Sequence, residues 1–164
     1  MRALPRLELR FGVGGSLRVR TSESFEQERT APPYVELQGA AVWGTPTPWQ
    51  HGLGISAATG LAGDGGLVQG VEQLEQWVLR ASYVGRLDLG PDWVAGGHAG
   101  PAFVTWGADH TWGVEAALSM AYRWLGGSGG YAQAGASWFA GGEGTGHTLL
   151  SVEAGLFLRA EVLP

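Results

Sequence analysis

The stretch from residue 7 to residue 20, LELRFGVGGSLRVR, alternates strictly between two kinds of side chain. Its odd positions are apolar or Gly, and its even positions are charged or small. Successive side chains of a β-strand point to opposite faces, so this period of two predicts a strand with one apolar face; a helix would mix the two sets. At about 3.3 Å per residue the stretch reaches about 46 Å, enough to cross a lipid bilayer at a tilt of about 45°.

The same alternation returns seven times, which predicts eight strands at residues 7–20, 34–43, 52–62, 75–89, 93–105, 112–124, 131–140 and 148–162. The polar stretches 21–32 and 63–73 predict the two longest loops, and Pro32-Pro33 marks the end of the first. Longer and shorter connections alternate, which is typical of an up-and-down barrel in an outer membrane. Pro101 lies inside one predicted strand and indicates a bulge or a local loss of pairing.

We therefore predict an all-β fold, an eight-stranded antiparallel up-and-down transmembrane β-barrel, as a single domain over residues 1–164. No apolar run approaches the roughly 18 residues of a membrane-spanning helix. The first residues, MRALPRLELRF, contain no apolar signal-peptide core, so we expect that the leader of an exported protein is not part of this chain. The net charge of −5, without a basic run, argues against a nucleic-acid partner.

The alternation alone does not say whether the apolar face points into the barrel or out into lipid. Only 15% of the residues are charged, which is low for a hydrated exterior. The charges on the polar face are nearly balanced, so they can pair with one another inside a narrow lumen. We therefore predict an outward apolar face and an inward charge network made of Glu8, Arg10, Arg18, Arg20, Glu36, Arg80, Arg86, Asp88, Glu115, Arg123, Glu153, Arg159 and Glu161.

Aromatic residues collect near the ends of the predicted strands. Their amphipathic rings favour the two membrane–water interfaces, so this pattern predicts two aromatic belts. The belt near the short turns contains Trp43, Trp49, Trp93, Tyr122, Trp124 and Tyr131. The belt near the long loops contains Tyr34, Trp77, Trp106, Trp112 and Trp138.

As a pattern of strands and loops over residues 6–162, the chain resembles the small eight-stranded bacterial outer-membrane proteins, the group of OmpX and of the membrane domain of OmpA. The segment from Glu153 to Ala160 resembles the C-terminal insertion signal of that group, although the chain continues to Pro164 and does not stop on an aromatic residue. The resemblance implies a bacterial outer-membrane location. It also implies a surrounding lipid bilayer, lipopolysaccharide or detergent as partner, and we expect a monomer.

Eight strands leave an interior just wide enough for side chains, which excludes a wide porin channel. We therefore expect a filled lumen and a structural or surface-interaction role, without catalysis, metal or cofactor. Three alternatives stay open: a narrow polar channel for small solutes or ions, a lipid A-modifying membrane enzyme, and a soluble lipocalin-like ligand-binding barrel. The acidic loops at 21–32 and 63–73 are candidate contacts for divalent cations, lipopolysaccharide or a partner protein.

The histidines give little support to catalysis or metal binding. They do not show the short spacings of a metal site, and His98, the one that falls in the middle of a strand, fits a hydrogen-bonded lumen residue. His147, Ser151 and Glu153 share the inward face of the last predicted strand. However, His147 and Ser151 would lie about 13 Å apart there, too far for a nucleophile and its base.

Overall fold

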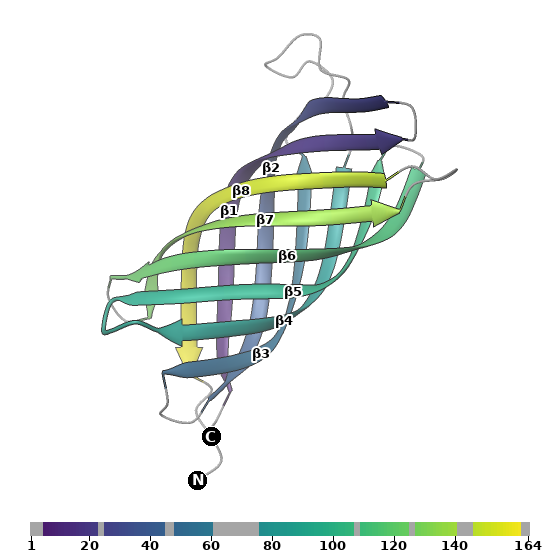
Figure 1. Ribbon diagram of the computed structural model, residues 1–164. Helices are drawn as coiled ribbons and strands as arrows, with labels where there is room; N and C mark the ends of the chain where they lie inside the picture. The colour runs from purple at the N-terminus through teal and green to yellow at the C-terminus, as the bar shows by residue number, and fades with distance from the viewer. Residues whose placement is uncertain are drawn as a thin grey trace.

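The computed structural model describes residues 5–22, 25–44, 48–60, 76–106, 109–124, 127–140 and 146–161. Eight strands form one closed barrel in sequence order, each antiparallel to the next, and the last pairs with the first (Figure 1). The predicted fold class is therefore confirmed. The strands are β1 (Arg6–Ser22), β2 (Phe25–Trp43), β3 (Trp49–Gly60), β4 (Gln76–Asp88), β5 (Trp93–Trp106), β6 (Asp109–Arg123), β7 (Ser128–Ala140) and β8 (Gly146–Glu161).

The strands are strongly staggered around the barrel. A walk from Arg6 through directly paired residues returns to β1 at Ser16, ten residues further along, by way of Val42, Gly52, Val84, His98, Ala117, Gly135 and Ser151. With eight strands, this stagger tilts each strand by about 40° from the barrel axis. A strand of 12 residues such as β3 then rises about 30 Å, which is the thickness of the hydrocarbon core of a bilayer.

The prediction of a loop over residues 21–32 is wrong. β1 continues to Ser22 and β2 starts at Phe25, and the two strands stay paired along this whole extension, which lies at the upper edge of the barrel in Figure 1. The pairing shifts by one residue between Gly14 and Ser16, opposite Pro32-Pro33, so the prolines mark a β-bulge. Outside a membrane both faces of a strand can be polar, so polarity there did not require a loop. The predicted loop 63–73 lies outside the described residues.

Pro101 disturbs the pairing of β5 on one side only. β5 pairs with β6 without interruption, and Pro101 lies opposite Val114. On the other side, where the described residues of β4 and β5 meet, the pairs between Arg80–Ala102 and Tyr83–Ala99 are missing, while the register is the same on both sides of the gap. Proline lacks the N–H that a ladder needs. The predicted local loss of pairing is therefore confirmed, and the register continues without a bulge.

The outer surface of the barrel is apolar. Leucine, valine, isoleucine and tryptophan side chains point away from the wall on every strand with described side chains, and Leu118 (76% exposed) and Ile55 (70% exposed) are the most exposed of them. This arrangement is the reverse of a soluble protein, in which such residues are buried. Among the described residues, no helix is long and apolar enough to cross a membrane.

The inner face carries apolar residues as well as charges. One cluster combines Ala58, Val78, Ala102, Val104, Phe139 and Leu149, with Tyr34 packed against it. Two smaller clusters combine Val94, Ala121, Tyr131 and Phe157, and Ala40, Val42 and Val84. Each of the four described inward aromatic side chains lies directly across a strand pair from a glycine: Tyr34 from Gly14, Tyr131 from Gly155, Phe139 from Gly113 and Phe157 from Gly129. The missing side chains leave the room that the rings occupy.

Candidate functional site: the charged lumen and the aromatic belts

The carboxylate of Glu8 binds three arginines in the part of the lumen where β1 begins and β8 ends. Glu8 accepts hydrogen bonds at Oε1 from Arg10 Nε (2.7 Å) and Arg86 Nη2 (2.8 Å). Its Oε2 accepts one from Arg159 Nη2 at 2.8 Å. We call Glu8, Arg10, Arg86 and Arg159 the basic group. Charge-assisted bonds of this kind are strong, and they offset the cost of removing the charges from water.

The arginines of the basic group, which outnumber its one carboxylate, also contact other groups of the barrel. Arg86 is fully buried, and its Nη1 donates to the carbonyl oxygens of Gly85 (3.1 Å) and Gly97 (3.4 Å). Arg10 donates to Ser119 Oγ at 3.3 Å, and its guanidinium lies 4.8 Å from the centroid of the Tyr131 ring. A cation over an aromatic face is attracted by the negative face of the ring.

A second group gathers further along the lumen, towards the β1–β2 extension. Arg80 forms ion pairs with Glu36 (3.0 Å) and Glu115 (2.6 Å), which reach it from β2 and β6. Glu115 also accepts a hydrogen bond from Ser137 (2.5 Å) and lies 3.3 Å from His98 Nε2. This contact agrees with the expectation that His98 is a hydrogen-bonded lumen residue, and His98 is only 7% exposed.

Glu153 completes this second group, which we call the acidic group (Glu36, Arg80, Glu115 and Glu153). Its Oε1 accepts a hydrogen bond from the hydroxyl of Tyr131. Its Oε2 is buried without a partner, and so is Oε1 of Glu36. The acidic group therefore contains three carboxyl groups for one guanidinium, while the basic group contains the opposite surplus.

The remaining predicted lumen charges lie at the barrel mouth or cannot be placed. Arg123 pairs with Asp88 where both side chains are 25% exposed, and Gln50 also donates to Asp88 at 3.0 Å. This pair therefore belongs to the rim of the barrel. The side chains of Arg18, Arg20 and Glu161 lie outside the described residues.

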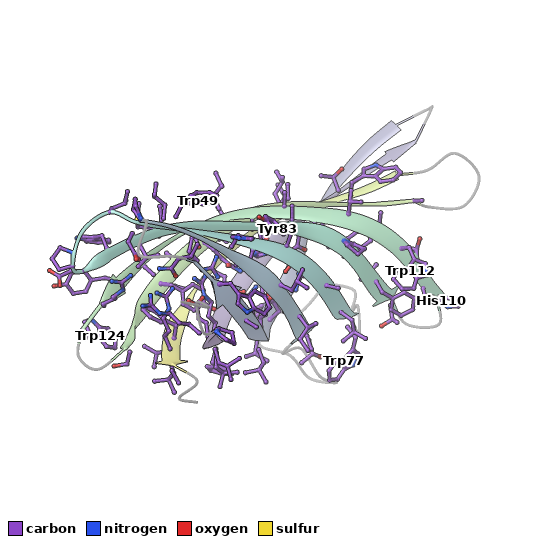
Figure 2. The ribbon with its side chains drawn as sticks, turned by 90° about the horizontal axis from the view of Figure 1, so that it is seen from below. Trp49, Trp77, Tyr83, His110, Trp112 and Trp124 are labelled. Atoms are coloured by element: carbon purple, nitrogen blue, oxygen red, sulfur yellow. The ribbon has the colours of Figure 1, made fainter. Side chains whose placement is uncertain are left out.

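The tryptophans form two sets at opposite ends of the outer surface. Trp43, Trp49, Trp93 and Trp124 lie at the end where β3, β5 and β7 begin, whereas Trp77, Trp112 and Trp138 lie at the other end. Figure 2 shows Trp49 and Trp124 towards one end, and Trp77 and Trp112 towards the other. Edge-on or tilted ring contacts join Trp93 to Tyr122 (centroids 5.0 Å apart) and Trp112 to Phe103 (4.9 Å). The side chain of Trp106 lies outside the described residues.

Two tyrosines do not belong to these belts, contrary to the sequence-based expectation. Tyr131 is only 6% exposed and points into the lumen, where it contacts Glu153 and Arg10. Tyr34 packs against the inward apolar cluster that contains Phe139. Both occupy inward positions in the alternation of their strands. The sequence-based expectation considered only that they lie near a strand end.

The triad considered above is not assembled from the described residues. Glu153 is bound by Tyr131, and Ser151 Oγ lies 3.5 Å from the carbonyl oxygen of Gly135. The side chain of His147 lies outside the described residues. In the part of the chain that the structure describes, no cluster of three or more histidine or acidic side chains is arranged to hold a metal ion.

Sequence reasoning missed the inward apolar residues. Val42, Val84, Val104 and Phe139 are at most 1% exposed, although they lie on the face that was expected to be small or polar. Their position in the alternation could have revealed them, because they lie on the same face of their strands as the inward charges. They fill the lumen between and beyond the charged groups.

A scan against family models finds no match, and neither does a search of the curated proteins. Solved structures do match along nearly the whole chain. Neisserial surface protein A has a TM-score of 0.55 at 9% identity, covering 92% of this chain and 96% of that one. Ail of Yersinia pestis, in complex with the heparin analogue sucrose octasulfate, has a TM-score of 0.53 at 7% identity, covering 93% and 99%. The outer membrane protein OprG of Pseudomonas aeruginosa has a TM-score of 0.51 at 9% identity, covering 98% of both chains.

These likenesses define the class of fold. The chain has the fold of the small eight-stranded transmembrane barrels of bacterial outer membranes, and the resemblance inferred from the sequence is confirmed at that level.

Proposed function

We propose that this chain is an integral outer-membrane protein with a filled, non-conducting lumen, which acts without catalysis as a structural or surface-interaction protein. The observation that carries the proposal is the apolar outer surface bounded by tryptophans at both ends. Exposed leucines such as Leu118 need a lipid environment, and tryptophans favour its two interfaces. Lipid, and lipopolysaccharide in the outer leaflet, are the partners of this surface.

The packing of the lumen supports a filled barrel. Val104 and Phe139 are fully buried in the apolar cluster beyond the acidic group, and Arg86 is fully buried in the basic group. A cavity of about 30 Å³ lies beside Arg80, Tyr34, Ser137 and Ser151. Such a volume holds about two water molecules. A cavity of this size favours a structural lumen over the alternative of a narrow channel.

The extension of β1 and β2 supports a role at the surface. Within the described residues, pairing with β3 begins at Tyr34, so the preceding part of β2, from Phe25 onwards, pairs with β1 alone. Among the described residues no strand pairs with its other edge, and the backbone N–H and C=O groups of such an edge can bind an extended peptide by strand addition. We propose this extension, together with the stretch 63–73, as the contact for a partner outside the membrane.

Measurements of solubility, gel migration, conductance and lipid A mass test the proposal. The purified chain should need detergent to stay in solution, and it should migrate differently on a gel before and after boiling, as a closed barrel does when it unfolds. In planar bilayers it should give no steady openings. Solubility without detergent would support a soluble ligand-binding barrel, and steady openings would support a channel. A change in lipid A mass upon expression would support an enzyme.

A further inference from the structure

Two glutamates lie on either side of β1 in the acidic group. Glu36 on β2 is paired directly with Gly12, and Glu153 on β8 is paired directly with Gly14. Both carboxyl groups are deeply buried, since Glu36 is 3% and Glu153 is 5% exposed. The two glycines between them have no side chain. The carboxyl group of Glu153 lies over Gly12, next to Glu36, so the two carboxyl groups face each other in front of β1.

A hydrogen bond between two carboxyl groups requires that one of them carries a proton, because an ionised carboxylate only accepts. We propose that the lumen holds one proton between these two residues, with Glu153 as the carboxylic acid and Glu36 as the carboxylate. The bond runs from Oε2 of Glu153 to Oε1 of Glu36. These are the two oxygens that otherwise lie buried without a partner, so a single proton satisfies both of them.

The neighbours of each carboxyl group decide which one keeps the proton. Glu36 Oε2 lies 3.0 Å from Arg80 Nη1, in an ion pair that a carboxylate makes with a guanidinium. In the described part of the chain Glu153 forms no salt bridge. Its Oε1 accepts a hydrogen bond from Tyr131, which leaves Oε2 as the position for the proton.

The surrounding groups favour a proton over a metal ion. Three groups interact directly with the pair: Tyr34 from β2, Arg80 from β4 and Tyr131 from β7. Arg10 of β1 lies over the ring of Tyr131, Glu115 of β6 is paired with Arg80, and His98 of β5 contacts Glu115. A Cβ added at Gly12 would collide with Glu153 and with the Tyr131 hydroxyl, so the space is already filled. A metal ion would need several oxygen ligands and room for them, whereas a proton needs no volume.

The shared proton links folding to pH. In the unfolded chain both glutamates are ionised at neutral pH, so the chain takes up one proton when it folds. Raising the pH therefore favours the unfolded state, and the folding equilibrium constant falls by up to tenfold per pH unit for this one proton.

Infrared spectroscopy of the full chain, folded in detergent at neutral pH, tests the proposal directly. A protonated carboxyl group gives a C=O stretching band that a carboxylate lacks. We expect this band in the unsubstituted protein, its loss in Glu153→Gln, and its loss also in Glu36→Gln, because the new amide donates the bond in place of the proton. Glu115→Gln is the matched control, since Glu115 is held by Arg80 and Ser137, and it should leave the band in place.

Unfolding measured between pH 6 and pH 9 gives a second readout. The unsubstituted protein should lose stability as the pH rises, and Glu153→Gln should lose this part of the pH dependence. The proposal is overturned if the unsubstituted protein shows no acid band, if the band survives both substitutions, or if added cations raise stability and Glu153→Gln abolishes that gain. The last result would place a metal ion at the site.

Discussion

The ring of Phe139 on β7 lies directly across the strand pair from Gly113 on β6, and a Cβ at that glycine would collide with the ring. The ring is fully buried. Phe139 can therefore occupy its place in the lumen only because residue 113 has no side chain.

Gly113→Ala should destabilise the barrel by about 1–3 kcal/mol, the usual cost of overpacking a tight interior. The comparison is Gly39→Ala, since Gly39 faces outwards and nothing lies within 4 Å of a Cβ added there. That substitution should be neutral or slightly stabilising. Urea unfolding of both variants in the same detergent measures the difference, and equal losses would contradict the packing described here.

Glu8→Gln should be far more destabilising than a change at the rim. It leaves the buried guanidinium groups of Arg10, Arg86 and Arg159 without their counter-charge, which we expect to cost about 3–5 kcal/mol. Asp88→Asn breaks the pair with Arg123, which is partly exposed, and should cost at most about 1 kcal/mol. Equilibrium unfolding of the two variants checks this order. A Glu8→Gln protein as stable as Asp88→Asn would mean that the basic group does not hold the strands together.

Leu118→Arg and Ser119→Arg place the same charge on opposite faces of β6. Leu118 is 76% exposed on the outer surface, so an arginine there should cost about 2–4 kcal/mol near the bilayer midplane. Ser119 accepts a hydrogen bond from Arg10, so an arginine there adds a fourth guanidinium to the basic group. Unfolding in bilayers of different thickness separates the two effects, because only the outward substitution should respond to thickness. An identical response of both variants would count against the assignment of the faces.

Much of the fold could be predicted because successive residues of a transmembrane barrel strand face the lipid and the lumen in turn. Alternate positions of the sequence therefore differ in polarity. The alternation in β6, from Trp112 to Tyr122, is regular enough to separate the outward residues from Glu115 and Ser119. Where the chain leaves the membrane this signal ends. The extension of β1 and β2 is paired through backbone groups, and a polar stretch such as residues 21–32 carries no alternation that distinguishes a strand from a loop.

The partners within the lumen could not be predicted, because they depend on the stagger between strands. Glu8 meets Arg86 across the barrel, and the two are separated by 78 positions in the chain. The sequence indicates that inward charges must pair, but it does not indicate which ones. Tyr131 and Tyr34 were assigned to the belts because they lie near strand ends. Whether such a residue faces the lumen or the lipid depends on its position in the alternation and not on its distance from the end.

The most direct test of the outward apolar face is the accessibility of β6 to molecular oxygen in lipid vesicles. A spin label is attached to single cysteines introduced at residues 114–120, and its collision rate with oxygen, which concentrates in lipid, is measured. We predict high rates at Val114, Ala116, Leu118 and Met120, and low rates at Glu115, Ala117 and Ser119, with a period of two residues. Rates of the opposite phase, or rates without a period, would contradict the account.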